Sequence, residues 1–346
     1  MGERYRSFDA VKGIACIAVI LIHYLFPEPF GTPVKTMCRF AVPVFFGISG
    51  YFFAKDGRCS TLSTVKKLRH ISVLILASGA FYFVFTLLFY PWYQESWTVR
   101  EFFAERVHTA SVIKFFLTND PFVYSHLWFL LALFYVYLLA LLVIRDQGRI
   151  RFCLPAGCVL LAGYSLLQEF SSVLGIKNSI WIPGTDRYLY FFNLFIFRAL
   201  PLFLLGYAMR RDGWRAFCRR IPDLLLVVVL FAGMALSVFE RVHTKEVQYF
   251  IGNLASAWAL MTICIKHPEK GSRALCFIGK ELSMYVYILH IAVGRVITGA
   301  ISKYGISSPA IKALTPVFVI VCTLLVSYLC CIMKHKIQSL QKPRRI

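Results

Sequence analysis

Charged residues are scarce in this chain, and acidic residues are the scarcest. Asp, Glu, Lys and Arg together make up 16% of the 346 residues, whereas soluble globular domains carry about 25%. Hydrophobic residues reach 58%, and they leave no stretch from which a soluble domain could be built. We therefore predict one membrane domain over residues 1–346, without an appended soluble domain.

Several catalytic and metal-binding motifs are also missing. The sequence has no GxSxG turn, no HExxH helix and no P-loop, so we expect the nucleophile to be a substrate hydroxyl rather than an enzyme serine. The 11 cysteines include no CxxC and no metal-type spacing, which predicts no bound metal. No apolar segment carries a buried pair of Asp or Glu residues, which disfavours transport driven through carboxylates.

Long apolar segments are what the chain has instead. A membrane-spanning helix needs about 20 apolar residues. We predict an all-α, polytopic transmembrane bundle of about ten spans, at 10–26, 37–54, 70–92, 123–144, 152–169, 188–209, 223–240, 247–265, 282–300 and 313–333. The second and sixth segments are the least apolar, because each contains an arginine and a proline.

The basic residues are distributed unevenly between the two sides of this bundle. A net charge of +21 can indicate a nucleic-acid partner, but in a membrane protein Lys and Arg collect on the cytoplasmic side. With ten spans and the N-terminus inside, most of the 38 Lys and Arg residues fall in the inner segments. We therefore predict a multi-pass protein of the inner (plasma) membrane, with both termini cytoplasmic and no nucleic-acid partner. The oligomeric state stays open.

Two ionisable residues of the first span share one helix face. Lys12 and His23 are 11 residues apart, which is close to three full turns and about 16 Å along a helix axis. Asp9 lies three residues before Lys12 and can pair with it. A cation at the inner entrance suits the phosphates of an anionic cofactor, and a histidine in a dry bundle can act as a general base. The alternatives are an interfacial lysine and a structural core histidine.

Polar and small residues also interrupt the second and fourth spans. The segment Phe45–Tyr51 contains Ser49 between two glycines, which allows either close helix packing or backbone access to a ligand. His126 and Trp128 open the fourth span from the outside, and an interfacial aromatic belt is the competing interpretation.

Three further groups lie at membrane depth. His290 lies near the middle of the ninth span, three residues after Tyr287, and a structural hydrogen bond is its alternative role. Arg39 and Arg198 each lie within a predicted span. An arginine there needs a partner or a ligand, so both are functional candidates.

Six segments, in their order along the chain, resemble landmarks of the acyltransferase-3 family of multi-span membrane O-acyltransferases. The first is its opening pattern of Arg or Lys, ten residues and His, here with Lys where many relatives have Arg. The matching segments are Ser7–Ala15 continuing to His23, Phe45–Tyr51, Lys66–Arg69, His126–Leu130, Arg198–Phe203 with Gly206, and Tyr287–His290.

The resemblance implies an acyl-CoA donor, with acetyl-CoA expected, that binds at the inner face. It implies an acceptor hydroxyl on a cell-surface sugar or lipid-linked glycan precursor, reached from the outer face, in a protein surrounded by membrane lipid. The segment Arg39–Phe46 also resembles the membrane domain of vancomycin-resistance serine racemases, where the membrane part is thought to handle amino-acid uptake. A transporter of an amino acid or another small solute is therefore the alternative, and a non-catalytic sensor is a third possibility.

These observations and the resemblance assign three groups of site residues. His23 is the expected general base, with Arg39 or His290 stabilising the oxyanion. The donor phosphates are expected at Lys12, Lys66, Lys67 and Arg69. The acceptor is expected at Ser49, His126, Trp128, Arg198 and Tyr287.

Overall fold

The computed structural model of the chain is helical almost throughout. The structure describes residues 5–53, 60–93, 98–106, 109–121, 124–143, 147–171, 175, 179–182, 188–190, 193–244, 247–306 and 308–341. The chain divides into two compact units, which are described separately. The first unit comprises Met1–Val42 and Thr262–Ile346, and the second comprises Pro43–Met261.

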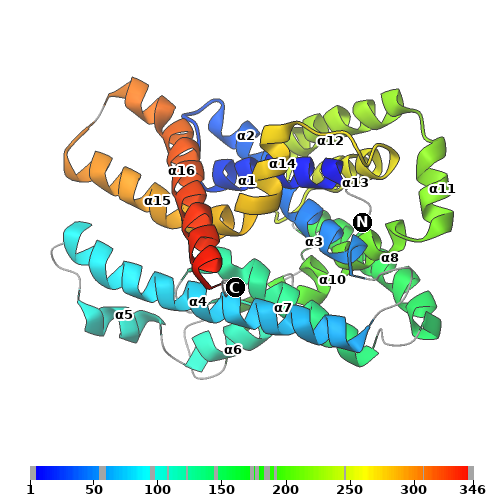
Figure 1. The fold of residues 1–346 in the computed structure, drawn as a ribbon, viewed down its shortest axis with the longest axis horizontal. Helices are drawn as coiled ribbons and strands as arrows, with labels where there is room; N and C mark the ends of the chain where they lie inside the picture. The colour runs from blue at the N-terminus through cyan, green and yellow to red at the C-terminus, as the bar shows by residue number, and fades with distance from the viewer. Residues whose placement is uncertain are drawn as a thin grey trace, which may run out of the picture. The chain divides into compact units, whose positions relative to one another are not determined.

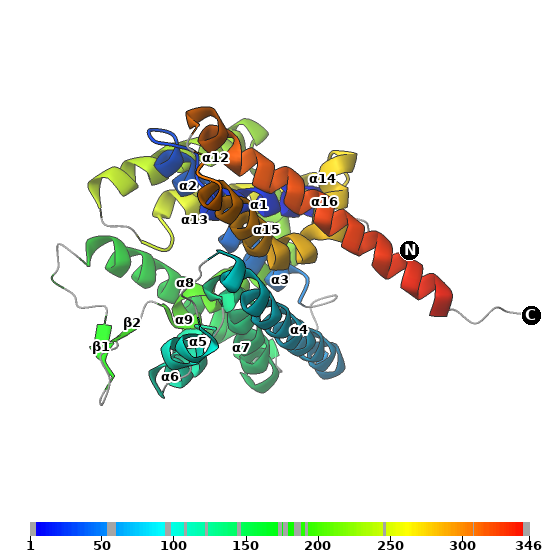
Figure 2. The same cartoon turned by 90° about the vertical axis from the view of Figure 1, so that its left-hand side faces the viewer.

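The first unit joins the two ends of the sequence. Its elements are α1 (Arg6–His23), α2 (Gly31–Cys38), α14 (Arg273–Phe277), the π-helical turn η3 (Ile278–Leu282), α15 (Ser283–Lys303) and α16 (Pro309–Gln341). Helices α15 and α16 pack against each other, and Figures 1 and 2 draw them in orange and red. Helix α1 packs against α2, α14, η3 and α15, so it is the central element of this unit.

Glycines allow α1 to approach its neighbours at backbone distance. A methyl group added at Gly13 would collide with the carbonyl oxygen of Leu275 in α14. A methyl group at Gly279 in η3 would collide with the carbonyl oxygen of Asp9. The start of α1 is fastened as well, because the Ser7 hydroxyl donates to the Cys264 carbonyl oxygen at 3.1 Å. The N-terminal half of α1 is therefore held in one position against α14 and η3.

The second unit contains the remaining elements. These are α3 (Ala41–Tyr51), α4 (Thr61–Tyr93), α5 (Val99–Arg106), α6 (Thr109–Thr118), the short 3₁₀ turn η1 (Ser125–Leu127), α7 (Trp128–Val143), α8 (Gln147–Phe170), β1 (Ser179–Trp181), β2 (Tyr188–Tyr190), α9 (Phe195–Arg198), α10 (Leu200–Met209), α11 (Asp212–Arg220), α12 (Asp223–His243) and α13 (Ile251–Lys266). Helix α3 begins two residues before this unit, and α13 continues into the first unit. Strands β1 and β2 pair antiparallel, with Ile180 opposite Leu189 (Figure 2).

Small residues bring the helices of the second unit together too. Gly47 of α3 and Gly206 of α10 meet backbone to backbone, and a methyl group at Gly50 would collide with the Phe203 carbonyl oxygen. The close helix approach predicted for Phe45–Tyr51 is confirmed. Close helix packing is enough to explain why glycines occupy these positions, without a role in binding a ligand.

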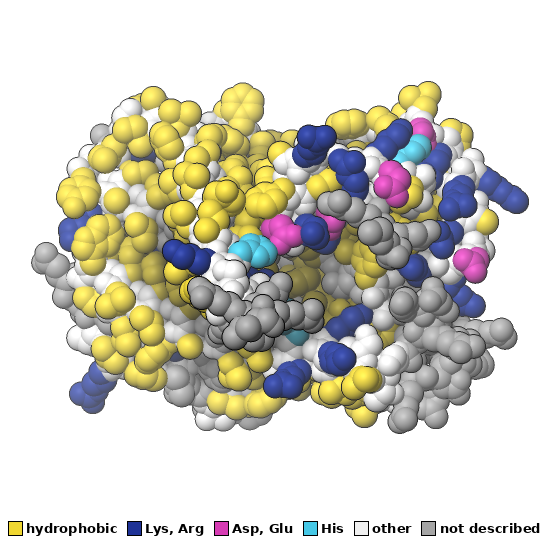
Figure 3. Space-filling model, viewed as in Figure 1, with side chains coloured by type: hydrophobic (Ala, Val, Ile, Leu, Met, Phe, Trp, Pro, Cys, Tyr) yellow, Lys and Arg dark blue, Asp and Glu magenta, His cyan; other side chains and the backbone are white. Residues whose placement is uncertain are grey.

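Five helical segments of the described chain are long and apolar enough to cross a membrane. They are Thr61–Tyr93, Ser125–Leu142, Asp223–His243, Arg273–Lys303 and Pro309–Leu340. Shorter apolar helices cover Thr109–Thr118, Pro155–Gln168, Phe195–Met209 and Ile251–Lys266. Large apolar side chains are exposed along α4, α12 and α16, and Figure 3 shows hydrophobic side chains over much of one face. The all-α character is confirmed, while ten spans and two cytoplasmic termini stay predictions.

Two predicted spans are interrupted. The span predicted at 37–54 contains a turn at Arg39 and Phe40, between α2 and α3. Pro43 explains this break, because it has no N–H to donate to the Arg39 carbonyl and its ring would clash with that carbonyl in a continuous helix.

The span predicted at 188–209 was wrong at its start. Residues Tyr188–Tyr190 form strand β2, and an aromatic tripeptide of this kind favours a strand. Helix begins only at Phe195 and breaks again at Ala199, next to Pro201 in the first turn of α10. Arg198 therefore lies at a helix break, as Arg39 does.

Candidate active site

His23 and His290 lie side by side in the first unit. His23 is the last residue of α1, and His290 lies in α15. Their ring centroids are 5.2 Å apart, with an angle of 47° between the ring planes. The His290 side chain is fully buried, whereas His23 is exposed. The pair thus combines an accessible imidazole with a buried one behind it.

The backbone of α15 fixes the orientation of His290. Its Nδ1 lies 3.0 Å from the Val286 carbonyl oxygen and 2.9 Å from the Tyr287 carbonyl oxygen. A carbonyl oxygen can only accept, so Nδ1 carries the proton and Nε2 is the basic nitrogen of the neutral ring. The Tyr287 ring also lies 6.4 Å from the His290 ring, which brings three predicted site residues together.

The end of α1 is held at this point by the residue that follows His23. The Tyr24 hydroxyl donates to the Ile291 carbonyl oxygen at 2.9 Å. The Tyr24 ring occupies the space that a side chain at position 294 would need, and Gly294 leaves that space open. These contacts lie next to both histidines in sequence, so they set the distance between the two rings.

Lys12 lies on the same helix as His23, near its other end. Helix α1 is continuous from Arg6 to His23, which keeps the two side chains on one face and about 16 Å apart along the axis. The Lys12 ammonium is 2.8 Å from the Asp9 carboxylate, as predicted, and both side chains are partly exposed. The local pair leaves Lys12 accessible to a ligand.

Arg39 follows the last residue of α2, which packs against α1. Its side chain is half-buried and belongs to the first unit, like those of His23 and His290. Its predicted role in stabilising an oxyanion stays a prediction.

Arg198 is the centre of a second cluster, in the second unit. Its side chain is only 7% exposed. The guanidinium carbon lies 3.9 Å from the centre of the Trp128 ring, and Nη1 donates to Asn193 Oδ1 at 3.2 Å. Among the described residues Arg198 makes no ion pair, and its buried Nε makes no hydrogen bond. This arrangement presents a desolvated cation and an aromatic ring together.

Two asparagines of this cluster were missed by the sequence analysis. The Asn119 Nδ2 donates to the Asn193 carbonyl oxygen at 3.3 Å, and Asn119 is fully buried with a positive φ of 57°. Asn119 lies between two predicted spans, where an asparagine is ordinary, and Asn193 is an uncharged residue near the start of the span predicted at 188–209. The search for ionisable groups at membrane depth therefore passed over both residues.

His126 and Ser49 have contacts of other kinds. His126 is buried in η1, 4.9 Å from the Tyr82 ring and 6.1 Å from the Tyr124 ring. The Ser49 hydroxyl donates to the Phe45 carbonyl oxygen one turn earlier, at 2.8 Å. The predicted binding roles of both residues stay predictions.

The three basic residues at the start of α4 differ in their surroundings. The Lys67 ammonium donates to the carbonyl oxygens of Phe52 and Phe53, at 3.1 and 3.2 Å, and lies 4.9 Å from the centre of the Phe53 ring. Lys66 and Arg69 are exposed. Lys67 therefore fastens the end of α3 to α4, which competes with the predicted phosphate role, whereas Lys66 and Arg69 are accessible.

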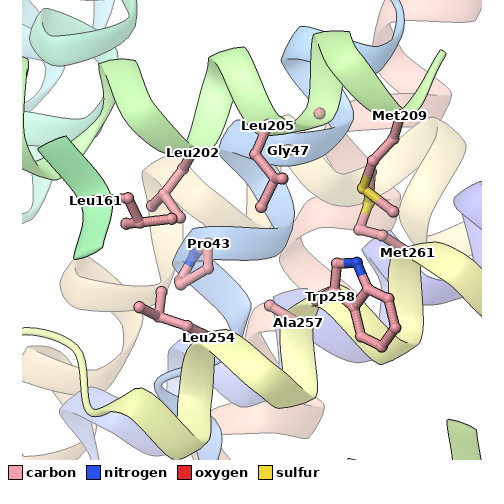
Figure 4. A pocket seen from close by; sticks show the side chains of 11 residues that line it. Pro43, Gly47, Leu161, Leu202, Leu205, Met209, Leu254, Ala257, Trp258 and Met261 are labelled. Carbon is pink, nitrogen blue, oxygen red and sulfur yellow. The ribbon is translucent and has the colours of Figure 1, made fainter. Parts of the chain in front are cut away.

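A small apolar pocket, partly open, lies between α3, α8, α10 and α13 (Figure 4). No lining side chain is titratable; the residues are Pro43, Gly47, Leu161, Leu202, Leu205, Gly206, Met209, Leu254, Ala257, Trp258 and Met261. The cavity contains none of the predicted site residues and suits only an apolar group.

The sequence was compared with models of known protein families. The model of the acyltransferase domain family that matches the chain covers residues 5–334. The chain belongs to the acyltransferase-3 family. The resemblance read from the six sequence segments is thus confirmed, and the chain is a multi-pass membrane protein of this family.

A curated relative of this acyltransferase-3 protein carries a different activity in its name. The chain is 26% identical over 359 residues to a protein named amino-acid racemase from Enterococcus faecalis. The match covers 98% of this chain but only 47% of that relative, so the chain spans about half of the relative's length. No solved structure matches the chain.

Proposed function

We propose that this acyltransferase moves an acyl group from cytoplasmic acyl-CoA to a hydroxyl of a cell-surface sugar or glycan precursor, with His23 as general base. Acetyl-CoA is the expected donor, and the inner membrane the expected location. The observation that carries the proposal is the His23–His290 pair, because it places an accessible imidazole against a buried, oriented one. The membership of the acyltransferase-3 family supports it.

The proposed reaction needs one proton to move twice. His23 takes the proton of the acceptor hydroxyl while the oxygen attacks the thioester carbonyl carbon. The tetrahedral intermediate then collapses, the carbon–sulfur bond breaks, and the imidazolium returns the proton to the CoA sulfur. No enzyme nucleophile is required, in keeping with the missing GxSxG turn.

His290 is better suited to orienting His23 than to stabilising the oxyanion. With its proton on Nδ1 and directed to backbone carbonyls, the neutral ring offers Nε2 as an acceptor, and an oxyanion needs a donor. Nε2 makes no hydrogen bond among the described residues. We propose that it accepts the N–H of His23 during the reaction, which would fix the His23 tautomer and leave the other His23 nitrogen basic. Arg39, a permanent donor, is the better candidate for the oxyanion.

Lys12 would bind the donor at the other end of α1. Its ammonium is suited to a CoA phosphate, and a separation of about 16 Å from His23 can be bridged by an extended pantetheine arm. Arg198 and Trp128 are the proposed acceptor residues, since a buried guanidinium over an indole ring can hold a polar group against an aromatic face.

The decisive experiment compares His23→Ala with a matched histidine variant. A deletion strain would be complemented with the wild type, with His23→Ala and with His243→Ala, which alters an exposed histidine of α12. Acetyl and succinyl esters on surface glycans would be measured by mass spectrometry. We expect His23→Ala to lower ester formation about 10²–10⁴-fold at equal membrane expression, because a general base is lost, and His243→Ala to leave it unchanged. Near-normal ester levels with His23→Ala would refute the proposal.

Transport of an amino acid is the second candidate. It rests on the resemblance of Arg39–Phe46 to the membrane domain of vancomycin-resistance serine racemases, where the membrane part is thought to handle amino-acid uptake. The similarity to a protein named amino-acid racemase agrees with that resemblance. Purified protein in proteoliposomes, supplied with a labelled amino acid and no acyl-CoA, tests this directly. Uptake above that of empty liposomes would favour the transporter.

A further inference from the structure

We propose that Glu281, Cys331 and His335 form a zinc site that fastens α16 to the π-helical turn η3. The three residues lie in the first unit, and their ligand atoms all lie within 4.8 Å of one another. The site is separate from the His23–His290 pair and does not depend on the proposed acyl transfer. It also departs from the expectation of no metal that the cysteine spacing gave.

Helix geometry places two of the ligands together. Cys331 and His335 are four residues apart on α16, so their side chains lie on one face of that helix, one turn apart. Cys331 is 4% exposed and His335 is 61% exposed, so the pair runs from the buried surface to the edge of the unit. A metal ion bound there would be covered by protein at Cys331 and accessible to solvent at His335.

The third ligand comes from a different element. Glu281 lies in η3, where the helix widens to a π-helical turn before α15 begins. One carboxylate oxygen, Oε2, is 3.9 Å from His335 Nε2. The other, Oε1, is 2.9 Å from the Lys280 ammonium. Oε2 can therefore ligate a metal while Lys280 keeps Oε1 as an outer partner, which orients the carboxylate.

The donor set determines the metal. A thiolate, an imidazole and a carboxylate are ligands that Zn²⁺ accepts, at about 2.0–2.3 Å, in a tetrahedron whose fourth position is left to water. Such distances require ligand atoms about 3.3–3.8 Å apart, so the observed cluster needs only small side-chain shifts to close on the ion. A Ca²⁺ or Mg²⁺ site would need oxygen ligands only.

The position of the site gives it a structural consequence. Both flanks, Lys280 and Lys334, fall in segments predicted to be cytoplasmic, where a thiol stays reduced. Gly279, two residues before Glu281, packs against the Asp9 carbonyl of α1. A zinc ion joining Glu281 to α16 would therefore also steady the surface on which the Lys12 end of α1 packs.

The test measures zinc in purified, detergent-solubilised protein that carries no histidine tag. We expect about one ion per chain in the wild type after dialysis against zinc-free buffer, by mass spectrometry of the metal. His335→Gln should lose it, because removal of a ligand weakens binding by more than the 10–100-fold that loss of an outer-shell partner costs. His335 is exposed, so this variant is expected to fold.

Cys330 supplies a matched control next to the proposed ligand. Cys330→Ser should retain zinc and Cys331→Ser should lose it, because Cys331 and not its neighbour belongs to the cluster. Cobalt loading gives a second readout, in which a thiolate-to-cobalt absorption band should appear in the wild type and in Cys330→Ser. The band should be absent from Cys331→Ser, with unchanged size-exclusion elution as the folding control. No stoichiometric zinc in the wild type, or equal zinc in the wild type and His335→Gln, would overturn the proposal.

Discussion

Replacing Gly279 with alanine should separate η3 from α1 and disturb the Lys12 end of that helix. A methyl group at this position would collide with the Asp9 carbonyl oxygen and lie 2.7 Å from the Gly13 nitrogen, closer than the 3.0 Å that real Cβ contacts essentially never fall below. All the opposing atoms are backbone, so no side-chain rotation can relieve the overlap. One of the two segments must move.

The magnitude follows from the cost of overpacking a core. An extra methyl group that forces backbone to shift costs about 1–3 kcal/mol. For a chain of this size, that corresponds to a fall in the midpoint of thermal unfolding of roughly 2–6 °C. Because Asp9 pairs with Lys12, we also expect the KM for acyl-CoA to rise more than the KM for the acceptor.

The control is Gly79→Ala, in the helical α4, where an added methyl group meets nothing within 4 Å. Tryptophan fluorescence during heating of both purified variants in the same detergent measures the difference. Equal unfolding midpoints for Gly279→Ala, Gly79→Ala and the wild type would refute the packing described for α1. A midpoint shift without any change in the KM for acyl-CoA would refute the link to donor binding.

Two further predictions separate binding from packing in the second unit. Lys67→Met should lower the thermal midpoint, because two charge-assisted hydrogen bonds at the end of α3 are lost, whereas Lys66→Met should leave it unchanged and raise only the KM for acyl-CoA. The reverse pattern would contradict the roles given to these lysines. Trp128→Leu should lower acceptor kcat/KM by about 10-fold, since a desolvated cation–π contact with Arg198 is worth up to about 2 kcal/mol, while Trp128→Phe keeps an aromatic face and should lose less. Equal losses of acceptor kcat/KM in the two Trp128 variants would contradict a role for the aromatic ring in acceptor binding.

The parts of the site that depend on local helix geometry could be predicted from the sequence. Lys12 and His23 align because they lie on one uninterrupted helix, and the pairing of Lys12 with Asp9 follows from their spacing of three. The contact of His23 with His290 could not be derived in this way, because 266 intervening residues must fold first. Only the resemblance to a family placed both histidines in one site.

The helix breaks inside two predicted spans have a common physical cause, whereas strand β2 at the start of the span 188–209 does not share it. Hydropathy averages over a window, so a single proline between apolar residues hardly changes the sum, although it removes a backbone donor and stops the helix. Pro43 and Pro201 both did this. Capping contacts such as those of Lys67 were equally invisible, because the acceptors are backbone carbonyls and carry no sequence signal.

The break at Arg198 has a consequence for how the protein is made. An arginine at the centre of an inserting helix costs about 2.5–3.5 kcal/mol during entry into the bilayer, and the proline next to the break further shortens the apolar helix available to offset that cost. The α9–α10 segment is therefore a poor substrate for insertion by itself and depends on helices synthesised before or after it. Exchanging Arg198 for leucine would ease biogenesis of the nascent chain while removing the cation from the finished enzyme, so the amount of protein in the membrane and its activity would change in opposite directions.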